Sequence, residues 1–123
     1  MKILFVGEKR SKTAIRMNVT WEDKRLASKQ LFDAFESIGI DTDEFQFCNV
    51  FEPSIIMIDE AVEENIPIVG MGNIAQVVLN KMGVPHTPMI HPAARGNIRK
   101  KQNYTEHVKN VLTDVQRKIS TRK

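Results

Sequence analysis

Short apolar runs alternate along this chain with stretches of helical periodicity, and this alternation limits the possible folds more than any other feature. The first run, Ile3 to Val6, is continuously apolar and ends at Gly7, which is typical of a strand covered on both faces. Further strands are expected at Phe45–Cys48, Ile66–Val69 and His86–Ile90. The pattern predicts a three-layer α/β sandwich, with a four-stranded, mostly parallel sheet between helices and right-handed crossovers.

Four stretches carry apolar residues at helical spacing. They cover 25–38, 53–65, 74–82 and 104–119, and Gly39 and Gly83 follow two of them as natural stops. Asn103 and Glu106 resemble a capping box at the start of the last helix. The residues expected to face the core include Leu31, Phe35, Ile55, Ile58, Val62, Ile74, Leu79, Met82, Val108 and Leu112.

Composition indicates an ordinary globular chain. The 123 residues suit a single domain over 1–123, and 41% hydrophobic with 27% charged residues excludes the composition of a disordered protein. The net charge of +3 favours anionic partners such as nucleic acids or nucleotides. No apolar segment is long enough for a signal peptide core or a membrane span, so we expect a cytoplasmic protein with no membrane partner.

The chain contains a single cysteine, Cys48. It excludes an internal disulfide, a four-thiolate zinc site and a four-cysteine iron-sulfur cluster. We expect Cys48 to be a small core residue, His86 and His107 to be structural or on the surface, and the protein to need no metal and no cofactor.

Polar residues gather in the loops that follow the expected strands. These loops read GEKRS, CNVFEPS, GMGN and HPAARG in chain order. In a parallel sheet, the loops after the carboxyl ends of the strands line the ligand crevice. The candidate site therefore lies at this one edge of the sheet.

The order of these motifs resembles the uracil-DNA glycosylase superfamily over nearly the whole chain, and is most similar to its thermostable bacterial and archaeal branch. The matching features are Gly7-Glu8 after the first strand, the aromatic Trp21 before the first long helix, Asn49 at a strand end, Gly70-Met71-Gly72 before a helix with Ala75, and His91-Pro92-Ala93. The resemblance implies the fold of this superfamily and a glycosylase activity on DNA. No motif is specific by itself, and the specificity lies in their order.

The resemblance assigns each residue a role. His91 would donate to the anionic oxygen that develops on the leaving base. Glu8 would orient or deprotonate the attacking water. Asn49 would read the base edge, Trp21 would stack on the base, and Gly7 would belong to the same base-binding site.

Basic residues after the first and fourth strands would form a groove for a phosphate backbone or a nucleotide phosphate. Backbone amides of Gly72 and Asn73 at a helix start would add an anion contact. The basic candidates are Lys9, Arg10, Lys12, Arg16, Arg95, Arg99, Lys100 and Lys101.

Each residue also has a simpler structural interpretation. His91 can hydrogen-bond a carbonyl at a strand end, Asn49 suits a turn, Trp21 can cover the edge of the core, and Glu8 can form a surface ion pair. The sequence also departs from the family. Arg10 replaces a proline of the first motif, the aspartate of the best-known members is absent, the iron-sulfur cysteines of the closest branch are missing, and the chain is short.

Three functions follow from these residues. The first is a minimal glycosylase that hydrolyses the bond between deoxyribose and uracil, or a related deaminated base, in single-stranded DNA or after base extrusion. The second is a non-catalytic protein of a phage or its host that binds modified DNA, a nucleotide or a signalling nucleotide in the same pocket. The third is an α/β nucleotide-binding regulator of another family. The sequence leaves the oligomeric state open.

Overall fold

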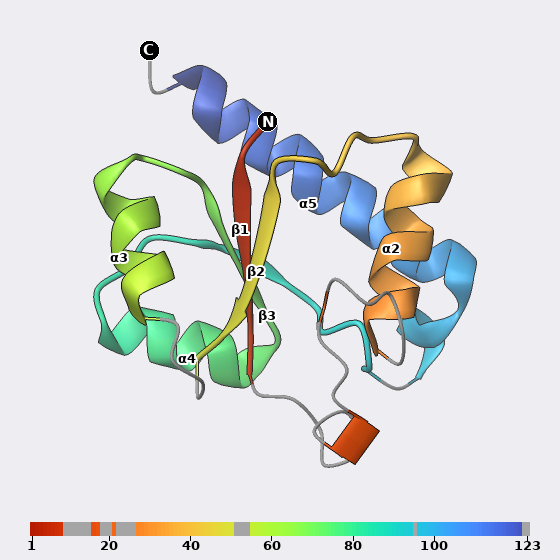
Figure 1. Ribbon diagram of the computed structural model, residues 1–123. Coiled ribbons are helices and arrows are strands. Elements are labelled where there is room, and N and C mark those ends of the chain that lie inside the picture. Colours follow the sequence, from red (N-terminus) through yellow and green to blue (C-terminus); the bar gives the residue numbers. More distant parts are fainter. Residues whose placement is uncertain (9–15, 18–20, 22–26, 51–54, 95, 122–123) are drawn as a thin grey trace.

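The computed structural model describes residues 1–8, 16–17, 21, 27–50, 55–94 and 96–121. Four strands alternate with helices along these residues (Figure 1). In chain order the elements are β1 (Ile3–Gly7), α2 (Ala27–Ile38), β2 (Phe45–Asn49), α3 (Ile55–Glu63), β3 (Ile68–Met71), α4 (Asn73–Lys81), β4 (Thr87–Met89), the 3₁₀ helix η2 (Asn97–Arg99) and α5 (Lys101–Thr121).

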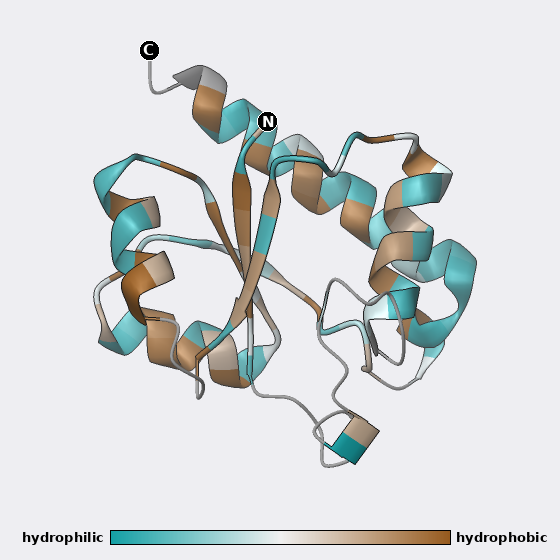
Figure 2. Ribbon diagram, in the orientation of Figure 1, coloured by the Kyte–Doolittle hydropathy of each residue, from teal (hydrophilic) through white to brown (hydrophobic). Residues whose placement is uncertain are grey.

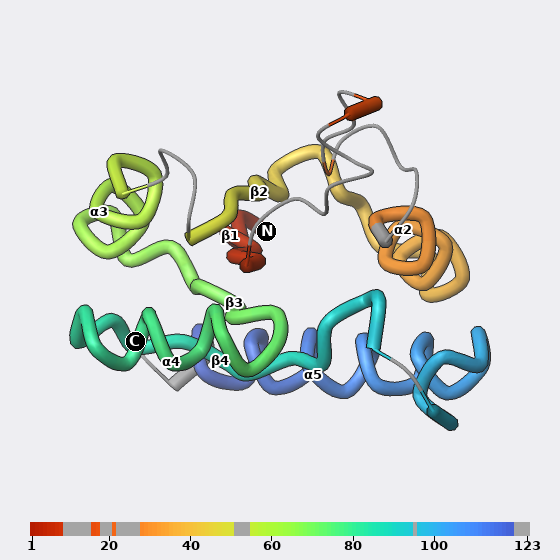
Figure 3. Tube along the Cα trace, turned by 90° about the horizontal axis from the view of Figure 1, so that it is seen from below, coloured from red at the N-terminus to blue at the C-terminus, as the bar shows by residue number. Residues whose placement is uncertain are grey.

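The strands form one sheet in the order β2-β1-β3-β4, and every neighbouring pair is parallel. Helices α3 and α4 cover one face, while α2 and α5 cover the other (Figures 1 and 3). The predicted α/β sandwich with a four-stranded sheet is therefore confirmed. All four carboxyl ends lie at the same edge, which is the lower edge in Figure 1.

Strand β1 lies in the centre of the sheet, and its side chains alternate between two cores. Ile3 and Phe5 pack with α2 and α5, whereas Leu4 and Val6 pack with α3 and α4. All four side chains are fully buried. The continuous apolar run of β1 thus reflects burial on both faces, and hydrophobic residues line the strands and the inner faces of the helices in Figure 2.

Two strands differ from their predicted bounds. β3 begins at Ile68, because the amide of Ile66 donates to the Ala61 carbonyl at the end of α3, at 2.8 Å. The strand then continues through Gly70 to Met71. β4 is shorter than expected because the Ile90 amide leaves the ladder and donates to the side chain of His107.

The last helix begins earlier than predicted. α5 starts at Lys101, so Asn103 lies inside the helix and the predicted capping box with Glu106 is wrong. The Asn103 side-chain amide instead donates to the carbonyl of Asn97 in η2, at 2.7 Å. α5 also reaches the start of β4, where the Lys118 amine donates to the Thr87 hydroxyl at 3.0 Å.

Helices α3 and α4 bury fewer side chains than their apolar content predicts. Only Ile58 and Ala61 of α3 are buried, while Ala75 and Leu79 are the buried residues of α4. Each helix buries only a narrow stripe of side chains, because it covers only part of one sheet face. Residues predicted to face inward but found exposed are Ile55, Val62, Ile74 and Met82. The expected start of α3 at Pro53, and residues 25–26 before α2, lie outside the described residues.

Candidate functional site

The site lies where the parallel strands end. Gly7 of β1 pairs in register with Asn49 of β2, and Met71 of β3 pairs with Met89 of β4. His91 follows β4 by two residues. The sheet therefore brings Gly7, Asn49 and His91 to one edge, as the alternation of strands and helices predicts.

Trp21 lies among these strand ends. Its indole Nε1–H donates a hydrogen bond to Asn49 Oδ1 at 2.9 Å. The indole stacks on Phe47 with ring centroids 6.3 Å apart, and it meets the His91 ring at 5.9 Å in a tilted arrangement. Asn49 and Phe47 are buried, while Trp21 and His91 are half-buried.

Gly7 provides the space for this arrangement. A Cβ atom at Gly7 would lie 2.7 Å from Asn49 Oδ1 and 2.9 Å from Trp21 Cζ2. The indole thus lies directly against the backbone of β1, where any other residue would displace it. We call the set Gly7, Phe47, Asn49 and His91, which surrounds the indole, the indole seat.

His91 is held as a neutral hydrogen-bond donor. The amide of Ala93 donates to His91 Nδ1 at 3.0 Å, so the proton of the neutral ring lies on Nε2. Burial lowers the pKa of His91 from its ordinary value, although the nearby carboxylate of Glu8 opposes this effect. At neutral pH the ring therefore presents an Nε2–H group rather than a full positive charge.

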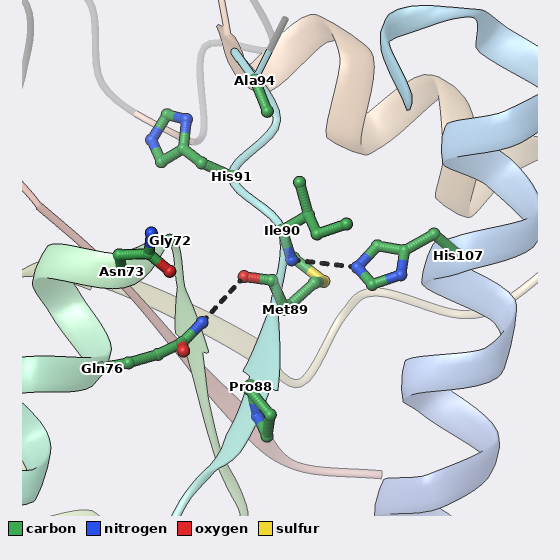
Figure 4. A pocket seen from close by; sticks show the side chains of 9 residues that line it. All are labelled: Gly72, Asn73, Gln76, Pro88, Met89, Ile90, His91, Ala94 and His107. Carbon is green, nitrogen blue, oxygen red and sulfur yellow. Dashed lines mark hydrogen bonds between the residues drawn. The ribbon is translucent and has the colours of Figure 1, made fainter. Parts of the chain in front are cut away.

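Two side chains of α5 fix the backbone that leads into His91. The hydroxyl of Tyr104 donates to the Ile90 carbonyl at 3.0 Å. The Ile90 amide donates to His107 Nε2 at 2.9 Å, as Figure 4 shows. Burial lowers the pKa of His107, which keeps its ring neutral and able to accept this bond, while burial raises the pKa of the Tyr104 phenol. Both polar groups of the Ile90 peptide backbone are thus satisfied by α5.

A second set of contacts joins β3 to β4. Gln76 of α4 donates through Nε2 to the carbonyls of Gly70 and Met89, each at 3.2 Å. Gly72 precedes α4 with φ of 92°, a left-handed conformation that favours glycine, and its amide donates to Met89 at 2.8 Å. A Cβ at Gly72 would lie 3.2 Å from His91 Cβ, so this backbone also touches the histidine.

These contacts surround a pocket of about 550 Å³. In Figure 4, His91 and His107 lie on opposite sides of the segment after β4, and the Asn73 side chain lies near the Gly72 backbone. The lining residues are Gly72, Asn73, Gln76, Pro88, Met89, Ile90, His91, Ala94 and His107. His91 therefore belongs both to this pocket and to the indole seat.

The structure brings together most of the predicted base-binding and catalytic candidates. Gly7, Trp21, Asn49 and His91 are in mutual contact or packed together, and Glu8 acts electrostatically on His91. Gly72 and Asn73 lie beside His91 in the pocket.

The predicted phosphate contacts are described only in part. Arg16, Arg99 and Lys100 have exposed side chains, and the carbonyl of Arg99 accepts a hydrogen bond from Gln30 of α2 at 3.0 Å. Lys9, Arg10, Lys12 and Arg95 lie outside the described residues.

Two residues that line the pocket are absent from the predicted site. His107 is expected to be structural or on the surface, and its bond to the Ile90 amide is a structural role, whereas no role is predicted for Gln76. The spacing of Tyr104 and His107 was the available signal, because residues three apart lie on one face of a helix. Cys48 is buried among apolar residues, as predicted.

Searches for related proteins identify no family. The sequence matches no protein-family model, and no curated protein matches it significantly. Within the described parts of the chain, no three histidine, cysteine, aspartate or glutamate side chains are grouped so that they would hold a metal ion. No helix in those parts is both long and apolar enough to cross a bilayer.

Proposed function

We propose that the protein is a DNA glycosylase-like hydrolase. It binds a base in single-stranded DNA, or one extruded from a duplex, and hydrolyses the N-glycosidic bond of uracil or a related deaminated base. One observation carries the proposal: a buried amide, Asn49, and the ring of His91 both contact the Trp21 indole at the carboxyl edge of a parallel sheet. The resemblance of the motifs in this order to the uracil-DNA glycosylase superfamily supports it.

The chemistry requires stabilisation of a negatively charged base. When the glycosidic bond breaks, electrons move onto the base and charge develops on a carbonyl oxygen. The Nε2–H of neutral His91 donates to that oxygen, and one such donor typically contributes about 3 kcal/mol of transition-state stabilisation. Glu8, near enough to affect the His91 pKa, orients the attacking water. The Asn49 amide pairs with the edge of the base.

A second candidate function is binding without hydrolysis. Arg10 stands where the first motif of the superfamily has a proline, and the aspartate of its best-known members is absent. A protein with this site but without efficient water activation would hold a nucleotide, a signalling nucleotide or modified DNA. The same Asn49 and His91 contacts would then supply affinity and not catalysis.

Cleavage of a labelled single-stranded oligonucleotide that contains one uracil tests the enzyme. Alkali converts each abasic site into a strand break. We expect breaks with the wild-type protein and a rate about 100-fold to 1,000-fold lower with His91→Gln. His86→Gln is the matched control, because His86 lies before β4 and bonds the Val84 carbonyl instead. Absence of cleavage on uracil, hypoxanthine and xanthine with excess protein would rule out the enzyme, and calorimetry with dUMP would then test binding.

Salt dependence tests the phosphate contacts. If Arg99 and Lys100 each contact one phosphate, the double variant Arg99→Gln/Lys100→Gln lowers the slope of log affinity against log salt by about 1.4 on single-stranded DNA. Lys109→Gln, an exposed lysine on α5, is the control and should leave the slope unchanged. Equal slopes for all three proteins would remove Arg99 and Lys100 from the interface.

A further inference from the structure

We infer that the indole of Trp21 is a built-in occupant of the ligand site: it fills the indole seat in the free protein and leaves when a planar heterocycle with a ring N–H binds there. The inference deepens the proposed function, on which the identity of the ligand as a nucleobase rests. It departs from the prediction that Trp21 stacks on the bound base, because the base and the indole would occupy the same seat.

The contacts of the indole are those expected of a bound base. Its ring N–H donates to the oxygen of Asn49, its face stacks on Phe47, and its edge reaches the backbone at Gly7. A base read by Asn49 uses the same three features: a ring N–H for the amide oxygen, an aromatic face, and a glycine that permits close approach. The seat is therefore already shaped around a flat ring of this chemistry.

The N–H defines the class of ligand. Uracil, hypoxanthine and xanthine carry a protonated ring nitrogen on the edge that pairs with other bases, whereas cytosine and adenine carry an unprotonated ring nitrogen there. An unprotonated nitrogen facing Asn49 Oδ1 would set two acceptors against each other. Thymine and guanine also carry a ring N–H on that edge, so the Asn49 oxygen discriminates against cytosine and adenine and accepts uracil, hypoxanthine and xanthine.

The Trp21 indole is less deeply buried than the aromatic residue of α5 beside the site. Its side chain is half-buried, whereas Tyr104 of α5, which bonds the Ile90 carbonyl, is 1% exposed. Stacking on Phe47 is an apolar contact that a nucleobase reproduces. The ligand binds only those molecules whose seat is empty. Its apparent affinity is therefore the intrinsic affinity multiplied by the fraction of molecules with an empty seat.

Fluorescence provides the first test, because Trp21 is the only tryptophan in the chain. Emission is recorded during titration with dUMP, with dCMP as the control, and binding is measured in parallel by calorimetry. We expect dUMP to shift the emission to longer wavelength and to increase quenching by acrylamide, while dCMP leaves both unchanged. Saturation with dUMP without a change in emission would overturn the inference.

Indole itself tests the seat without assuming a nucleobase. Trp21→Ala empties the seat, and added indole should then raise the Tm of this variant. 1-Methylindole, which lacks the N–H, should raise it less, and wild-type protein should respond to indole less than Trp21→Ala does, because its own indole competes for the seat. Equal responses to the two compounds, or none, would overturn the inference. Rescue by indole together with no dUMP binding by any variant would support the seat and reject the proposed nucleobase function.

Trp21→Phe provides a second route if Trp21→Ala does not fold. This variant keeps a ring but loses the N–H, so the internal competitor is weaker and dUMP should bind about five-fold more tightly. Phe32→Leu, a half-buried aromatic residue that packs against Phe47 outside the seat, is the matched control and should bind like wild type. Unchanged affinity in Trp21→Phe would contradict competition by the indole.

Discussion

The two sides of the candidate site are held by different kinds of contact. On the side of β1 and β2, the Trp21 indole is held in the indole seat by ring packing on Phe47 and by its hydrogen bond to Asn49. On the side of β3 and β4, side chains of α4 and α5 bond to backbone groups. These side chains are Gln76, Tyr104 and His107, and the groups are the carbonyls of Gly70, Met89 and Ile90 and the amide of Ile90.

The difference separates an exchangeable side from a fixed one. Ring contacts tolerate the replacement of one flat ring by another, provided that the incoming ring supplies an N–H for Asn49. Hydrogen bonds to backbone groups are directional, and loss of Gln76 or Tyr104 removes a donor from a part-buried carbonyl. His91 lies between the two sides, because the residue before it is bonded to α5 and its ring contacts Trp21 in the indole seat.

Truncation of one aromatic residue on each side should give the largest difference in unfolding free energy between the two sides. Tyr104→Ala removes a fully buried ring and an anchor of Ile90, and should cost about 3 to 5 kcal/mol of unfolding free energy. Trp21→Ala removes a larger but half-buried side chain and should cost less than about 2 kcal/mol. Urea denaturation measures both. If Trp21→Ala proved the more damaging change, the indole would be a core residue and the contrast would fail.

A methyl group at Gly7 tests the exchangeable side directly, because it would clash with the indole. Gly7→Ala places a Cβ within 3 Å of the indole and of Asn49, and should cost about 1 to 3 kcal/mol while shifting the Trp21 emission to longer wavelength. In a Trp21→Ala background the same change should cost less, since one of the two clashes is gone. Additive costs in this double-mutant cycle would show that the indole does not lie on Gly7.

Loss of the Gln76 amide tests the fixed side. Gln76→Leu removes the donor to the Gly70 and Met89 carbonyls and should cost about 0.5 to 1.5 kcal/mol. The Trp21 emission should stay as in wild type, because the indole seat is formed by other residues. A red-shifted emission in this variant would mean that the two sides are coupled.

Acidification should produce the smallest effect. Burial lowers the pKa of His107 and of His91 in the folded protein, so the unfolded chain binds more protons as the pH falls below about 6.5. The contribution of the two neutral histidines to the free energy of unfolding is therefore fully present above that pH. It is lost progressively as the pH falls from 7 to 5. His107→Gln keeps an acceptor for the Ile90 amide without titrating, and should flatten this decrease. A decrease equal to that of wild type would exclude a titrating His107.

Much of the fold, and part of the site, could be predicted from periodicity. Gly7 and Asn49 end their strands and His91 follows one, so these residues lie at one edge, because parallel strands share their carboxyl ends. Periodicity does not encode how much of a helix the sheet covers, so it wrongly placed Ile55 and Ile74 inside.

Sequence patterns do not predict which side chains form hydrogen bonds with one another or with the backbone. Periodicity places Tyr104 and His107 on one face of α5 but does not identify the Ile90 backbone as their partner. It also places an aromatic residue near the site without indicating that the Trp21 N–H donates to Asn49. Both contacts depend on where segments distant in the sequence meet.

The attachment of α5 to both ends of β4 also has a kinetic consequence. Lys118 bonds Thr87 at the start of the strand, and Tyr104 and His107 bond Ile90 just after its end. A three-residue edge strand has few ladder bonds of its own, so β4 and α5 should open and close as one cooperative unit. Hydrogen exchange at the Ile90 amide would then follow the opening of the last helix, and each opening would release His91 from its place in the site.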